Sequence, residues 1–117
     1  MPTEKVSKSE KDKFDPIRKG LLEYVVLNVI SARKVYAADI LAAIAETEFA
    51  TQEGTLYPLL SRMRREGTVD YEWVESDAGP PRKYYHLTAK GREQLAAQSD
   101  YWDELQETIK NLGRKNK

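Results

Sequence analysis

The sequence predicts a mainly α-helical chain with one small β-hairpin and a long final helix. Three observations predict this class. Apolar residues recur at helical spacing in three early segments, a short stretch alternates apolar and charged residues as a half-buried strand does, and a last segment repeats apolar residues every seven positions. The chain has 117 residues, of which 40% are hydrophobic, and this size suits one small soluble domain with a single core.

The first helix is expected to begin at Asp15, after a flexible polar arm of residues 1–14 that lacks apolar periodicity. Asp15 is predicted to be the N-cap because Pro16 follows it, and proline fits the first position of a helix. The helix should run to about residue 32 with two apolar lines, and it is therefore expected to touch two neighbours. The lines are Ile17, Leu21, Val25, Val29 and Leu22, Val26, Ile30.

Two shorter helices are predicted next. Residues 36–47 form the second, and the third should start from Thr51 as N-cap and stop at Gly67. Pro58 falls inside the third helix, but the residue four positions earlier is Gly54, which leaves room for a bend. The expected inward face of the third helix consists of Leu56, Leu59, Leu60 and Met63.

A hairpin is predicted after the third helix. Val69, Tyr71 and Trp73 alternate with acidic residues as one half-buried strand, a turn follows, and Tyr85 and Leu87 mark the inner face of the second strand. Three helices, a hairpin and a further helix follow one another in the order of a winged helix-turn-helix. Residues 15–88 are therefore expected to form the winged-helix domain.

The final helix, capped by Thr88 and stopped by Gly113, is expected to dimerise the protein. It would be about 36 Å long at 1.5 Å per residue, longer than a small helical body can cover. The alternative is a helix that folds back on its own domain. Residues 89–113 thus form a predicted dimerisation helix, followed by a tail of residues 114–117. Its two heptad lines are Leu95, Trp102, Ile109 and Gln98, Leu105, Leu112.

Several classes of protein are excluded by what the chain lacks. It has no cysteine and a single histidine, His86, so it offers no disulfide, no thiolate and no zinc finger. It has no glycine-rich phosphate loop and no nucleophile beside a plausible base, so neither an enzyme nor a cofactor is expected. No apolar run is long enough to span a bilayer, and the start is not signal-like, so a cytoplasmic protein is expected. The formal net charge of zero argues against a nonspecific polycation.

The outward face of the third helix predicts contact with DNA. Arginine can pair with guanine or phosphate, and hydroxyl groups can donate to phosphate. Arg82 and Lys83, at the tip of the hairpin, are expected to contact the DNA backbone as a wing does. The alternative is a solvated face whose arginines pair with Glu66 or other carboxylates. The predicted contacts on the helix are Thr55, Tyr57, Ser61, Arg62 and Arg65.

Trp102 has two interpretations. As a residue in the heptad line, it fills the seam of a dimer, which is the usual role of an aromatic side chain at that spacing. Two such rings facing each other across a two-fold axis can instead leave a flat slot for a planar ligand. The sequence alone favours the first interpretation, in which Trp102 fills the seam of the dimer.

Two segments give the chain a family resemblance. EGTLYPLLSRMRREG and TVDYEWVESDAGPPRKYYHLTAKGR resemble the PadR-type bacterial transcriptional regulators, which share a Glu-Gly-Thr-Leu-Tyr-Pro start of the recognition helix and a wing ending in Arg-Lys-Tyr-Tyr-x-Leu-Thr-x-x-Gly. The resemblance covers residues 17–112 and is to the short branch, with a single terminal helix. It implies that Thr55 and Tyr57 face DNA and that Arg82 and Lys83 are wing contacts.

The resemblance also implies a ligand, and the chain departs from the family pattern in one place. Trp102 is similar in position to a tryptophan in the dimer pore of multidrug-sensing members, with Tyr24 nearby. Where many members have Gly-Tyr, this chain has Ala37-Ala38, and Tyr36 is the candidate to fill that space. The predicted function is a dimeric repressor of operator DNA, released by a small planar or aromatic effector. The rival is a winged-helix module that binds proteins and has no affinity for DNA.

Overall fold

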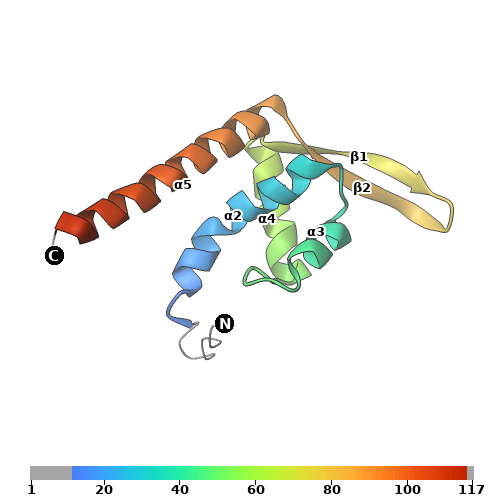
Figure 1. Cartoon of the computed structure of the whole chain (residues 1–117). Coiled ribbons are helices and arrows are strands. Elements are labelled where there is room, and N and C mark those ends of the chain that lie inside the picture. Colours follow the sequence, from blue (N-terminus) through green and yellow to red (C-terminus); the bar gives the residue numbers. More distant parts are fainter. Residues whose placement is uncertain (1–11, 116–117) are drawn as a thin grey trace.

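Figure 1 shows a computed structural model of the chain, which describes residues 12–115. Three helices pack together, and the hairpin and the last helix project from them in different directions, so that the molecule measures 61 × 32 × 26 Å. The predicted class is confirmed. The parts of the predicted arm and tail at residues 1–11 and 116–117 lie outside the described residues. The elements are α2 (Asp15–Ala32), α3 (Ala37–Ile44), α4 (Glu53–Arg65), β1 (Val69–Ser76), β2 (Gly79–Leu87) and α5 (Ala89–Lys115).

The core lies where α2, α3, α4 and the base of the hairpin meet. One apolar line of α2 contributes to it through Val26 and Ile30, both almost completely buried. The other line is exposed only at its start: Ile17 is 55% exposed, Leu21 and Val25 are half-buried, and Val29 packs against the core. The prediction that the helix touches more than one neighbour is confirmed, since α2 contacts α3, β2 and α5. The other main core residues are Leu27, Val35, Ile40, Leu56, Leu60, Met63, Val69, Tyr85 and Leu87.

The predicted N-cap of α2 is wrong by one residue. Phe14 is the N-cap, because its carbonyl oxygen accepts the first helical hydrogen bonds from the amides of Ile17 and Arg18, at 3.0 and 3.1 Å. Asp15 is already helical, and its carboxylate instead pairs with the side chain of Arg18 one turn later. An acidic group in the first turn still interacts favourably with the helix dipole.

The predicted limits of α3 and α4 need two corrections. α3 ends at Ile44 and not at residue 47, because the hydroxyl of Thr47 donates to the Ile44 carbonyl at 2.7 Å and accepts the amide of Phe49. α4 starts after Gln52 and not after Thr51, since the Gln52 carbonyl accepts the first helical hydrogen bonds. The predicted stop at Gly67 is confirmed by its left-handed φ of 84°.

The hairpin is antiparallel, with Val69 opposite Leu87 at its base and Val74 opposite Arg82 towards its tip. Its base is fixed to the helices by Val35, which exchanges two backbone hydrogen bonds with Tyr85, at 2.6 and 3.1 Å. The predicted burial is confirmed at the base. It is wrong for Trp73, which is 62% exposed, because the hairpin extends past the helices (Figure 1).

α5 begins as predicted, with the hydroxyl of Thr88 accepting the Gly91 amide at 3.0 Å. The predicted stop at Gly113 is wrong. A glycine inside a helix costs only about 1 kcal/mol relative to alanine, and the helix continues to Lys115 here, with Arg114 donating to Asn111 at 3.2 Å. The far half of α5 points away from the domain (Figure 1), so the helix does not fold back on it.

Candidate nucleic-acid interface

The outward face of α4 is the first part of the site. Leu56, Leu60 and Met63 are completely buried, which fixes the rotation of the helix about its axis. The residues predicted to face outward are all exposed, as the periodicity indicates. They are Thr55, Tyr57, Ser61, Arg62 and Arg65.

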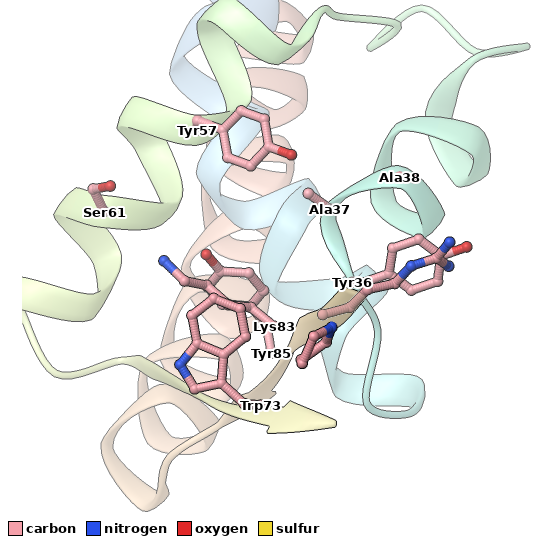
Figure 2. A pocket seen from close by; sticks show the side chains of 10 residues that line it. Tyr36, Ala37, Ala38, Tyr57, Ser61, Trp73, Lys83 and Tyr85 are labelled. Carbon is pink, nitrogen blue, oxygen red and sulfur yellow. The ribbon is translucent and has the colours of Figure 1, made fainter. Parts of the chain in front are cut away.

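A groove of about 510 Å³ separates α4 from the hairpin, which forms the wing (Figure 2). Tyr57 and Ser61 line it from α4, and Trp73 lines it from β1. Tyr36 lines it from the position just before α3, next to Ala37-Ala38, which stand where many members of the resembled family have Gly-Tyr. The charged residues in the lining are Arg82 and Lys83 of the wing. None of the described residues that line this groove is acidic.

The two wing cations rest on aromatic rings. The guanidinium carbon of Arg82 lies 4.6 Å from the ring centre of Tyr36, and the ammonium nitrogen of Lys83 lies 4.6 Å from that of Tyr71. Such contacts orient a cation without neutralising it. Within residues 12–115, neither Arg82 nor Lys83 forms an ion pair with a carboxylate. Their charge is therefore available to an anion in the groove.

Two of the three carboxylates of β1, those of Asp70 and Glu72, are engaged outside the groove lining. Asp70 accepts hydrogen bonds from the Tyr71 amide and from Arg64, at 2.8 and 3.2 Å, and both interactions lower the pKa of this carboxyl. Lys34, whose ammonium lies 2.6 Å from Glu72, lowers the pKa of Glu72 in the same way. Both carboxyl groups are therefore negatively charged near neutral pH, and each is paired with a cationic side chain.

Three residues in or beside the groove are not among the DNA contacts that the sequence predicts. Arg64 lies over the Tyr71 ring at 4.6 Å and was not placed on the outward face. Tyr36 and Trp73 line the groove, although the sequence predicts neither of them as a DNA contact. For Arg64, the signal in the sequence is its spacing of seven from Tyr57, which places both residues on one side of a helix.

Arg62 and Thr55 lie on the opposite side of α4, towards α2. A guanidinium nitrogen of Arg62 lies 3.0 Å from Glu23 and another lies 3.7 Å from Glu66. Glu23 also accepts a hydrogen bond from Gln94 of α5, at 2.9 Å. One carboxylate thus connects α2, the recognition helix and the terminal helix. The structure does not bring Arg62 to the wing groove.

The residues predicted for dimerisation and effector binding lie along α5 and α2. Leu95 packs against the core of its own chain. Beyond it the apolar line becomes progressively uncovered: Trp102 and Leu105 are half-buried, and Ile109 and Leu112 are 66% and 56% exposed. Tyr24, on α2, is half-buried. These residues therefore form an apolar surface on the projecting helix.

Comparison with known proteins identifies the family. Residues 26–97 match the Transcriptional regulator PadR-like family. The chain belongs to this family. It is 42% identical to a PadR-like transcription factor from Bacteroides fragilis, whose X-ray structure has a TM-score of 0.75 over 86% of this chain and 98% of that one. A PadR-like transcriptional regulator from Bacillus cereus is 37% identical, with a TM-score of 0.75 over 84% and 96% of the two chains. A protein of Lysinibacillus sphaericus described as uncharacterized is 27% identical over 96 residues, 80% of this chain and 88% of its own length.

As a PadR-family member, the chain is a DNA-binding transcriptional regulator and not an enzyme, which confirms both predictions. The winged helix-turn-helix and the single long α5 agree with this assignment. Within residues 12–115, no three metal-ligating side chains are grouped, and no helix is long and apolar enough to cross a bilayer.

Proposed function

We propose that this PadR-family regulator is a homodimeric cytoplasmic repressor that leaves its operator when a small planar or aromatic molecule binds between its two α5 helices. The observation that carries this proposal is the uncovered apolar line on the far half of α5. Ile109 and Leu112 are more than half exposed on a helix that projects from the domain. Exposed apolar patches of this kind are typical of interaction sites.

A second copy of the chain is the partner that would cover this line. A two-fold dimer pairs the same surface on both chains, so α5 would pack against its copy and against the exposed start of α2. Phe14 and Ile17, at the start of α2, are 48% and 55% exposed and supply the complementary apolar surface. Such a dimer presents two recognition helices, as two half-sites about 34 Å apart require.

DNA contact in this proposal is divided between α4 and the wing. Tyr57, Ser61 and Arg65 would enter the major groove, while Arg82 and Lys83 would hold the backbone beside it. Thr55 would contact DNA from the other side of α4. Arg62 would reach a phosphate only by leaving Glu23, so it is the weakest of the predicted contacts. The rival, a protein-binding module without DNA affinity, is disfavoured because the family is one of DNA-binding regulators.

Release by an effector requires coupling between α5 and α4. Trp102, with Tyr24 of α2, would form the ligand slot at the centre of the dimer. Glu23 joins Arg62 of α4 to Gln94 of α5, so a change in the angle between α2 and α5 acts on the recognition helix directly. The ligand then shifts the population towards the dimer whose recognition helices are wrongly spaced for the operator.

The wing contacts are tested by changing Arg82 and Lys83 together to alanine. Affinity for a fragment of the protein's own promoter should fall, and the slope of log K against log salt should decrease by about 0.9 for each phosphate that the wing no longer neutralises. Repression of a reporter gene should weaken in parallel. Binding is measured by fluorescence anisotropy over a series of salt concentrations.

The matched control changes Lys110 and Arg114 to alanine, which removes the same charge from exposed positions on the outer face of α5. This control should bind with the wild-type slope. An unchanged slope in the wing variant would contradict the wing assignment. Absence of any salt-dependent binding by the native protein would contradict the proposed function itself and favour the protein-binding module.

The effector slot is tested by changing Trp102 to alanine. Acidic neighbours Asp100, Asp103 and Glu104 favour cationic or neutral ligands over anions. Stacking contributes about 0.5–1.5 kcal/mol for each aromatic pair, so removing both indoles should weaken binding of a planar cationic dye about tenfold. Dye binding is measured by tryptophan quenching in the native protein and by dye emission in the variant.

A variant with Trp73 changed to phenylalanine is the control, because the chain has two tryptophans and Trp73 supplies background emission. It should retain the full dye affinity. Sedimentation must show that the Trp102 variant keeps the oligomeric state of the native protein. Equal dye affinity in the Trp102 variant and the native protein would make Trp102 an ordinary seam residue.

A further inference from the structure

Trp73 is a large aromatic side chain that faces solvent over the wing groove. Its side chain is 62% exposed, and Tyr57, on the other wall of the groove, is 48% exposed (Figure 2). Neither residue contributes to the core. Exposed aromatic side chains that line one concave surface mark a binding site more often than single scattered ones do.

The orientation of the Trp73 indole is held by neighbouring rings. Tyr71 packs edge-on against it, with ring centres 6.1 Å apart and planes 87° apart. Tyr71 packs in turn against the buried ring of Tyr85, with centres 5.7 Å apart. The exposed indole is therefore connected to the core through two rings. Binding a ligand costs less conformational entropy when the side chain is already held in place than when it is free.

The charge around the indole selects the ligand. The ammonium group of Lys83 lies 5.4 Å from the centre of the Trp73 ring, and Arg82 lines the same groove. No acidic side chain lines it within the described part of the chain. In the backbone of a nucleic acid, the apolar face of each sugar lies between two negatively charged phosphates. A flat apolar side chain next to unpaired cations suits such a backbone.

We propose that Trp73 is a DNA-contacting residue, whose indole packs against a deoxyribose of the strand that passes between the wing and α4. Lys83 and Arg82 hold the phosphates on either side of that sugar. This inference rests on the proposed function and adds a contact that is neither ionic nor specific for a base. It therefore contributes affinity that does not depend on salt or sequence.

Replacing Trp73 by alanine separates this contact from the ionic ones. Affinity for the promoter fragment and for unrelated DNA should fall by the same factor, about tenfold for the loss of buried apolar surface, while the slope of log K against log salt stays unchanged. Trp73→Phe should recover most of the affinity. Arg82→Ala with Lys83→Ala should instead change the slope.

The matched control is Val74→Ala. Val74 is the next residue of β1, is 39% exposed and does not line the groove. It should bind DNA as the native protein does. Thermal unfolding of all variants checks the fold, and little change is expected because both side chains are largely outside the core.

Fluorescence gives a direct readout of the contact. Trp102→Phe leaves Trp73 as the single tryptophan, and added DNA should quench its emission and shield it from acrylamide. If the native protein binds DNA while Trp73→Ala binds equally well and the Trp73 emission does not respond, the inference is wrong and the proposed function stands. If the native protein binds no DNA, both are wrong.

Discussion

Gly91→Ala is expected to destabilise the fold by about 3 kcal/mol, a value at the upper end for forced overpacking. A Cβ atom at position 91 would lie 2.0 Å from the carbonyl oxygen of Thr68 and 3.0 Å from its carbonyl carbon. Both are backbone atoms, so no side chain can turn aside to make room. The start of α5 would have to move away from the base of β1.

Thr68 cannot move in response, because its backbone is bonded on both sides. Its amide donates to the Met63 carbonyl at 3.0 Å, and its carbonyl accepts the Thr88 amide at 3.1 Å. Its side chain is buried and donates to the same Met63 carbonyl at 3.1 Å. Displacing Thr68 would therefore break the junction between α4, the hairpin and α5.

Gly20→Ala is the matched control. Gly20 also lies inside a helix, but nothing lies within 4 Å of the position of its Cβ. The gain in helix propensity, about 1 kcal/mol, is the same at both sites, so the control should be neutral or stabilising. Thermal unfolding should show Gly91→Ala melting roughly 10–20 °C below the native protein. Equal melting temperatures for the two variants would mean that the junction is not tightly packed.

The role of Gly91 could not be predicted from the sequence by local rules. It is the glycine of the Leu-Thr-x-x-Gly pattern, and its backbone is helical, so no turn or left-handed conformation requires it. The requirement is the close approach of Thr68, a residue 23 positions earlier. Local periodicity contains no information about such an approach.

The rotation of α4 about its axis, in contrast, was predictable because it follows from a local pattern in the sequence. Leu56, Leu60 and Met63 recur at helical spacing, and the burial of these three side chains dictates which residues face outward. The same periodicity could not show that Arg62 pairs with Glu23, because Glu23 lies 39 positions away. It could not show either that Trp73 is exposed, since alternation tells which side of a strand a residue faces but not whether another element covers that side.

The second large effect is expected from Leu105→Asp with Ile109→Asp. In the proposed dimer, these changes place four carboxylates in an apolar seam without partners, which costs several kcal/mol. In the single chain, Ile109 is already 66% exposed and Leu105 is half-buried, so the winged-helix domain should keep its fold. The structure thus predicts dissociation without global unfolding.

The measurement is sedimentation velocity at micromolar concentration, combined with circular dichroism and with binding to the promoter fragment. The variant should sediment as a folded monomer and lose most of its operator affinity, because one recognition helix reaches one half-site only. The control is Lys110→Asp with Asn111→Asp, which makes a larger change in charge on exposed positions outside the heptad lines. It should remain dimeric. A seam variant that stays as dimeric as this control would contradict the proposed packing of α5 against its copy, and the exposed start of α2 around Ile17 would then be the next part of the interface to test.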